Sequence, residues 1–160
     1  MIQNFLSAKN FDFTINRLPN VEFFVQGANI PGLSISPTVQ ATPFSPIHRP
    51  GSKLTFDEFS VTIRLDENLS SYREIFDWMV GMTSPTNFNE YTNLIAGDGV
   101  FSDASLIILN SKGNPTIDFR FKDLFPIGLS SIQLNTTDTS TQFATTNITF
   151  KYTTFEIVDI

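Results

Sequence analysis

Hydrophobic and polar residues alternate over residues 54–56 and again over residues 59–65, but the second run has the opposite parity. Because successive side chains of a strand point to opposite faces of a sheet, a single strand through both runs needs a bulge or sharp bend at residues 57–58. From residue 69 the apolar residues recur at intervals of three and four, which predicts an amphipathic helix. The pattern therefore predicts a long bent strand that leads directly into a short helix.

The expected helix has recognisable ends and one apolar stripe. Asn68 or Ser71 can cap its N-terminus, since Ser71 and Glu74 have the spacing of a capping box, and Gly81 and Pro85 end it. Its stripe, which we expect to face the core, consists of Leu69, Tyr72, Ile75, Phe76 and Met79. Trp78 lies outside the stripe, so we expect it to pack at the edge of the helix against the loops or a neighbouring chain.

Other apolar runs, most of them alternating with polar residues and the one at 106–109 continuous, predict strands of an antiparallel sheet. They lie at residues 11–15, 21–25, 106–109, 117–121, 127–134 and 143–157. We expect the first two runs to form an opening hairpin, and the next two to form a hairpin over the turn at 111–114. The last run changes parity between Tyr152 and Phe155, and two long strands that both bend indicate sheets packed at an angle or a small barrel. Residues 83–99 show no periodicity and are expected to form a surface loop.

Length and aromatic content narrow the fold class. The chain has 160 residues, enough for one domain with a substantial core, and 17 of them are Phe. Aromatic and Thr-rich alternating segments favour strands over helices. We therefore expect a single domain over residues 1–160 that is mainly β. It would be a small β-barrel of two packed antiparallel sheets, with one short α-helix and long inter-strand loops.

Charge and cysteine content exclude several kinds of site. Ten basic and sixteen acidic residues give a formal net charge of −6, which argues against a protein that grips nucleic acid through its phosphates. The chain contains no cysteine, so it forms neither disulfides nor thiolate metal sites. Its N-terminal residues do not resemble a signal peptide, and no segment is as apolar as a membrane span. We expect a soluble protein made in a cytoplasm, with no membrane partner.

The single histidine, His48, is the first candidate for chemistry. It lies beside Arg49 and is not accompanied by a nucleophile elbow or an oxyanion loop. A general base acting on Ser45 is therefore a weaker interpretation than a structural or interface role. The adjacent carboxylates at 57–58 and 66–67 point to opposite faces of a strand and lack the spacing of an EF-hand. We expect no enzyme activity, no metal and no cofactor.

Residues 27–51 combine five prolines with many apolar side chains. Proline lacks the N–H that a central strand donates, so the segment is expected to be a long loop. A loop with this much apolar surface needs a partner, and we expect that partner to be another subunit. The candidate interface residues are Ile30, Pro31, Leu33, Val39, Phe44, Ile47, His48 and Arg49, together with Trp78 from the helix.

Six motifs follow one another along nearly the whole chain. They are FDFTI at 11–15, ANIPG at 28–32, GSKLTFDEFSVT at 51–62, YREIFDW at 72–78, FKDLFPI at 121–127 and FKYTTFE at 150–156. In this order they resemble the tail tube protein family of contractile-tailed bacteriophages, whose fold is shared with tube proteins of type VI secretion and contractile injection systems. Within the fifth motif, Asp123 stands where the family commonly has glycine.

This resemblance implies a structural role. Members of the family form six-fold rings that stack into a hollow tube inside a contractile sheath, and viral DNA passes through the lumen without specific binding. The implied partners are further copies of the chain, the sheath protein, and the baseplate and tail-terminator proteins, in a virion tail assembled in the host cytoplasm. The net negative charge suits such a lumen, because like charges do not hold DNA.

Four alternatives stay open at this point. A specialised ring at the baseplate end that initiates the tube would have the same fold, as would the tube protein of a contractile injection system that is not a phage. A lipocalin-like barrel that binds a small ligand would also combine long strands with one helix, although it would not need an apolar, proline-rich loop. An esterase built around His48 is the weakest alternative.

Overall fold

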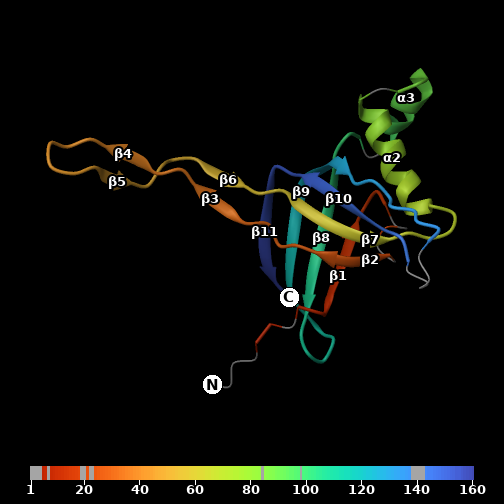
Figure 1. Cartoon of the computed structure of the whole chain (residues 1–160), viewed down its shortest axis with the longest axis horizontal. Coiled ribbons are helices and arrows are strands. Elements are labelled where there is room, and N and C mark those ends of the chain that lie inside the picture. The colour runs from red at the N-terminus through yellow and green to blue at the C-terminus, as the bar shows by residue number, and fades with distance from the viewer. Residues whose placement is uncertain are drawn as a thin grey trace.

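The computed structural model describes residues 5–6, 8–18, 21, 24–83, 85–97, 99–137 and 143–160. Its strands are β1 (Phe11–Ile15), β2 (Val25–Ala28), β3 (Leu33–Ile35), β4 (Thr38–Gln40), β5 (Ile47–Arg49), β6 (Leu54–Phe56), β7 (Phe59–Arg64), β8 (Ser102–Leu109), β9 (Pro115–Leu129), β10 (Thr145–Lys151) and β11 (Thr154–Asp159). Within these residues two helices, α2 (Ser70–Thr83) and α3 (Phe88–Ala96), lie between β7 and β8. Figure 1 shows a body of packed strands, with both helices at one end and a thin arm projecting at the other.

The strands of the body form two layers that share β9. The pairing order is β1-β8-β9-β10-β7-β2, with β11 also on β9, and every pair is antiparallel. Residues 115–124 of β9 pair with β8 and β11, whereas residues 125–129 pair with β10. Asp123 has a positive φ of 54° at this transition, where the chain bends. The first layer is therefore β1, β8, β9 and β11, and the second is β9, β10, β7 and β2.

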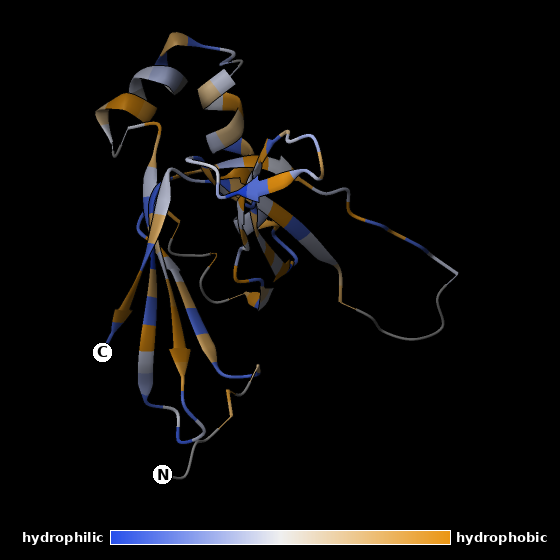
Figure 2. Cartoon of the chain, turned by 90° about the vertical axis from the view of Figure 1, so that its left-hand side faces the viewer, coloured by the Kyte–Doolittle hydropathy of each residue, from blue (hydrophilic) through white to orange (hydrophobic). Residues whose placement is uncertain are grey.

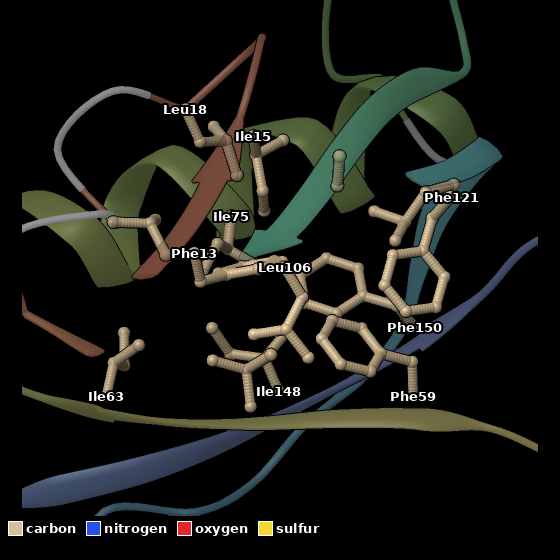
Figure 3. Close-up of a cluster of buried hydrophobic side chains, with 14 of the residues drawn as sticks. Phe13, Ile15, Leu18, Phe59, Ile63, Ile75, Leu106, Phe121, Ile148 and Phe150 are labelled. Carbon is tan, nitrogen blue, oxygen red and sulfur yellow. The ribbon is translucent and has the colours of Figure 1, made fainter. Parts of the chain in front are cut away.

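An aromatic core fills the space between the two layers. Phe59 of β7 is fully buried, and its ring stacks on that of Phe121 of β9 with 4.5 Å between the ring centroids. Phe13 and Phe150 also pack on the Phe59 ring, with 5.3 and 6.2 Å between ring centroids, so strands of both layers contribute. Figure 3 shows these rings among aliphatic side chains, together with Ile75 from α2. The expectation of a mainly β domain with two packed antiparallel sheets is confirmed.

Both predicted register slips occur where one strand ends and another begins. Residues 57–58 separate β6 from β7, and residues 152–153 separate β10 from β11. At the first break the chain enters the body: β6 pairs only with β3, whereas β7 lies between β2 and β10. At the second break the chain crosses from the second layer to the first. Within the described part of the chain, no pairing joins β1 to β2.

One of the two predicted hairpins is present. β8 and β9 pair across the turn at 111–114, where Gly113 has a φ of 81° and the Asn110 side chain accepts two backbone N–H groups. The opening hairpin is not among the described pairings, because β1 pairs with β8 and β2 pairs with β7, and residues 19–20 and 22–23 of its turn and second run lie outside the described residues. The paired strands are far apart in sequence, and a turn motif between two neighbouring segments does not predict such long-range pairing. The strand expected at 127–134 is the end of β9, which stops at Leu129.

The expectation of one short helix is wrong, because α3 occupies residues that we expected to be a loop. Its apolar residues Phe88, Tyr91, Leu94 and Ile95 recur at helical intervals, but a single stretch of 9 residues is too short for that pattern to stand out. Leu94 is buried against the body, whereas Phe88 is 92 % exposed. Figure 2 shows hydrophobic stretches on both helices, at the end of the molecule above the strands.

Asp66 caps the start of α2, whereas the sequence motifs pointed to Asn68 or Ser71. The carboxylate of Asp66 accepts both the backbone N–H and the hydroxyl of Ser70, each at 2.8 Å. The hydrogen bond from the Ser70 hydroxyl lowers the pKa of Asp66. Ser71 cannot act as the cap, because it lies inside the helix and is fully buried. Asp66 is four residues before Ser70, outside the spacing of a capping box.

The core face of α2 is rotated relative to the predicted stripe. Ser71, Ile75, Trp78 and Gly81 are its buried residues. Trp78 is 2 % exposed, and its indole N–H donates to the carbonyl of Val100 at 3.0 Å, so it packs against a loop of its own chain. Phe76, expected in the core, is 51 % exposed. Residues two apart lie on opposite sides of a helix, so burial of Trp78 turns Phe76 outwards.

Candidate functional site

The arm, residues 33–56, consists of two short ladders in series (Figure 1). β3 pairs with β6 next to the body, and β4 pairs with β5 towards the tip. Pro37 and Pro50 lie between the ladders, where the missing N–H of proline interrupts no strand pairing. The prediction that this segment is not an interior strand is confirmed. The prediction of a loop is wrong, because the segment is a paired ribbon.

Apolar side chains of the arm lie in solvent. Phe44, in the loop at the tip, is 99 % exposed. Five others are 46–56 % exposed, namely Leu33, Ile35, Val39, Ile47 and Leu54. A two-stranded ribbon has no second layer that could bury them. Exposed apolar surface of this kind marks a surface that contacts another molecule.

The base of the arm is tied to the body by polar and aromatic contacts. The N–H of Asp57 donates to the carbonyl of Gly32 at 3.0 Å, and the hydroxyl of Tyr152 donates to the carbonyl of Asp57 at 2.8 Å. The Phe56 ring packs edge-on against Tyr152 and Phe155, with centroids 6.0 and 5.7 Å away. Burial, and secondly the charge of Asp57, raise the pKa of Tyr152 to about 12. The arm therefore leaves the body from a fixed joint.

The two strands of the arm approach closely between the ladders. A Cβ added to Gly51 would lie 1.9 Å from the carbonyl oxygen of Ser36. That oxygen belongs to the backbone and cannot rotate away as a side chain would. Gly51 is therefore required for the path of the arm.

The arm differs in charge from the rest of the molecule. It carries Arg49 and Lys53 and no acidic residue, while the whole chain has ten basic and sixteen acidic residues. The remainder of the chain consequently has a formal net charge of −8. An apolar, basic arm is thus attached to an acidic body.

Six of the nine predicted interface residues lie together on the arm and are exposed: Leu33, Val39, Phe44, Ile47, His48 and Arg49. Ile30 is 44 % exposed just before the arm begins. Pro31 is buried at the base and Trp78 is buried in the core, so neither presents its side chain on the surface of a protomer. Sequence reasoning missed Ile35 and Leu54, although their period-two spacing from Leu33 and Phe56 was a usable signal.

The surroundings of His48 are those of a contact surface. It is exposed on β5, opposite Val39 of β4. Within the described residues, no group of three acidic or histidine side chains is placed to hold a metal ion. The same part of the chain contains no helix that is both long and apolar enough to cross a membrane.

A known protein family resembles this chain in sequence, and solved structures resemble it in fold. A family model described as "Phage tail tube protein" matches residues 2–158. The tube terminating cap of the anti-feeding prophage has a TM-score of 0.72 at 13% sequence identity, covering 100% of this chain and 95% of that chain. A chain of the sheath-tube complex of an extracellular contractile injection system has a TM-score of 0.70 at 13% identity, covering 99% and 95%. The sheath/tube terminator of such a system has a TM-score of 0.66 at 12% identity, covering 99% of each chain.

These similarities differ in what they establish. The solved structures are too distant in sequence to show more than a common fold. A comparison with curated proteins finds no match. The family model, in contrast, covers nearly the whole chain, which is the span over which the six motifs were found.

Proposed function

The chain belongs to the phage tail tube protein family, and from this premise we propose that it forms homohexameric rings that stack into the inner tube of a contractile tail. It is a structural protein of a tail particle and not an enzyme. In the proposed assembly the tube lies inside a contractile sheath, and baseplate and tail-terminator proteins bind its two ends. Viral DNA leaves the particle through the lumen.

The observation that carries this proposal is the exposed apolar surface of the arm. The tip residue Phe44 is 99 % exposed, and no part of the body lies near enough to cover the arm (Figure 1). A projecting surface that binds a different surface on the next copy makes a head-to-tail contact. Head-to-tail contacts close into rings or continue as filaments, and a tube of stacked rings uses both arrangements.

The charge of the body fits a conduit for DNA. With a formal net charge of −8 outside the arm, the walls of the tube repel phosphates rather than bind them. DNA would therefore pass without a specific binding site. The basic residues of the arm are used in contacts between subunits in this arrangement, and not in contacts with DNA.

A second candidate is the tube of a contractile injection system that carries no genome. Two of the structures reported above are titled as parts of an extracellular contractile injection system, and the matched chains share this fold. A third is the tube-initiating ring at the baseplate. Nucleic acid that is protected from nuclease inside purified particles would distinguish the first candidate from the second, and the position of the chain in labelled particles would distinguish the third.

The experiment that tests the proposal is Phe44→Asp, with Ser111→Asp in the exposed β8–β9 turn as a control of equal charge. A buried interface carboxylate without a partner is strongly unfavourable. We expect the native chain and Ser111→Asp to form rings or tubes, and Phe44→Asp to stay monomeric with an unchanged circular dichroism spectrum. Light scattering across a concentration series and negative-stain images give the readout.

Two results would contradict the proposal. One is a native chain that stays strictly monomeric at high concentration, even after a tube-nucleating complex is added. The other is a Phe44→Asp chain that loses its fold, because Phe44 would then belong to the core of the body and not to a contact surface.

A further inference from the structure

The end of the body that carries the helices contains a cleft of about 600 Å³ between α2 and α3. Its walls include five apolar side chains, Leu18, Phe76, Trp78, Val80 and Leu94. Two carboxylates, Glu74 and Asp77, and one cation, Arg17, also line it. We call this feature the helical cleft. Nothing in the proposed tube has so far been assigned to it.

Exposed apolar residues extend from the helical cleft across α3. Phe76 is 51 % exposed, Phe88 92 % and Ile95 52 %. A short amphipathic helix in a single domain usually turns such residues inwards, whereas α3 keeps them outside, and among its described side chains Leu94 alone is in the core. Among the described residues, exposed apolar side chains therefore lie on the helices as well as on the arm.

The two surfaces have opposite charge. Residues 66–97 contain five acidic residues and one basic residue, and Arg17 also lines the helical cleft, so the helical end has a formal net charge of −3. The arm has a formal net charge of +2. Two apolar surfaces attract each other when their net charges have opposite signs, whereas two surfaces with net charges of the same sign do not. Each surface is thus better suited to the other than to a second copy of itself.

We propose that the tip of the arm of one copy docks in the helical cleft of a neighbouring copy. In this contact Phe44 packs against the apolar wall formed by Phe76 and Leu94, and Arg49 lies next to Asp77. The arm cannot reach the cleft of its own chain, because the arm and the helices lie at opposite ends of the molecule (Figure 1). The inference rests on the proposed function and adds the receiving surface, which the proposed function leaves open.

The absence of cysteine from the native chain makes the contact directly testable. One chain carries Ser45→Cys beside Phe44, and a second, tagged chain carries Val80→Cys, which lines the helical cleft. Mixed under assembling conditions and then oxidised, the two chains should form a disulfide-linked heterodimer in high yield. The control pairs Ser45→Cys with Ser111→Cys on the β8–β9 turn, and only background linkage is expected.

The outcomes separate this contact from the proposed function. If tubes form but Ser45→Cys links no better to Val80→Cys than to Ser111→Cys, the docking proposal is overturned and the tube stands. If the chain does not assemble at all, both are overturned. A Val80→Cys thiol that is blocked from labelling in tubes and reactive in monomers supports docking. A Val80→Cys thiol that is equally reactive in tubes and in monomers overturns the docking proposal. The cleft would then be open to another partner, such as the sheath.

A charge exchange tests the orientation of the same contact. Arg49→Glu and Asp77→Arg should each raise the concentration needed for assembly, by about fivefold for a pair at the rim of an interface. The chain with both changes should recover, because the ion pair is restored with reversed signs. If the single changes acted only by destabilising the fold, the chain with both changes would not recover assembly. Failure to recover overturns the placement of Arg49 beside Asp77.

Discussion

β6 and β7 are separated by two residues and both alternate apolar and polar residues, yet only β7 is buried. β7 lies between β2 and β10 with a second layer behind it, and its inward residues Phe59, Val61 and Ile63 are fully buried. β6 pairs only with β3, and its residue Leu54 is 46 % exposed. Alternation thus predicts a strand in both cases, while burial depends on whether a second layer exists. The arm has no such layer among the described residues, and its apolar side chains stay exposed.

The comparison predicts that equal aromatic truncations have unequal effects. Phe59→Ala removes a ring that stacks on three others and leaves a cavity, so the free energy of unfolding should fall by about 3–5 kcal/mol. Phe44→Ala should change it by no more than about 0.5 kcal/mol in the monomer, because the side chain is already in solvent. Urea denaturation of dispersed monomers measures both values. Similar losses would show that the arm is part of the core.

The body was the more predictable part of the fold. Periodicity identified the break at residues 57–58, the β8–β9 hairpin and the break at residues 152–153, because each of these is a local feature of the backbone. It predicted β1 as a strand with the correct bounds, but it did not predict the pairing of β1 or β2, whose partners are more than thirty residues away in sequence. It also missed α3, because a helix of 9 residues shows too few turns to establish a period.

The interface was predictable in composition but not in geometry. Prolines and apolar residues together indicated a segment in need of a partner, and six of the nine residues chosen are exposed on the arm. Trp78 was chosen because it lay off the apparent stripe, and the structure buries it since its ring and indole N–H find partners near Val100. The helical cleft was not predicted at all, because it depends on how α3 packs on α2.

A change at the junction of the ladders should disturb the arm without disturbing the body. Gly51→Ala would place a Cβ 1.9 Å from a backbone oxygen, so the β3–β6 and β4–β5 ladders cannot both be kept. We expect the opening free energy of the arm to fall by about 1–3 kcal/mol, as for other overpacked sites. Hydrogen exchange should then be faster at amides of β3 and β6 and unchanged in β7.

Gly27→Ala is the matched control for this change. A Cβ there meets its nearest atom, Cβ of Thr62, at 3.9 Å, an ordinary contact. Gly27→Ala should therefore assemble like the native chain, whereas Gly51→Ala should not. Faster exchange throughout the body of Gly51→Ala would mean that the arm and the body fold as one unit, and the contrast between β6 and β7 would lose its basis.

The smallest effect is expected at the joint between the two regions. Tyr152→Phe keeps the ring against Phe56 and Phe121 but removes the hydrogen bond to the carbonyl of Asp57. The free energy of unfolding should fall by about 0.5–1.5 kcal/mol at neutral pH. Denaturation in urea measures the difference, and Tyr91→Phe on α3, whose ring is partly exposed, serves as the control with no expected loss.

The pH dependence of this difference identifies its source. Burial raises the pKa of Tyr152 from 10.0 to about 12 in the folded chain, so the folded state holds the phenolic proton more tightly than the unfolded state does. The stabilisation is complete below pH 10 and is lost as the pH rises towards 12. The native chain should therefore lose stability relative to Tyr152→Phe over this range. A difference that stays constant up to pH 12 would place the hydroxyl in solvent, and the arm would then be joined to the body by aromatic packing alone.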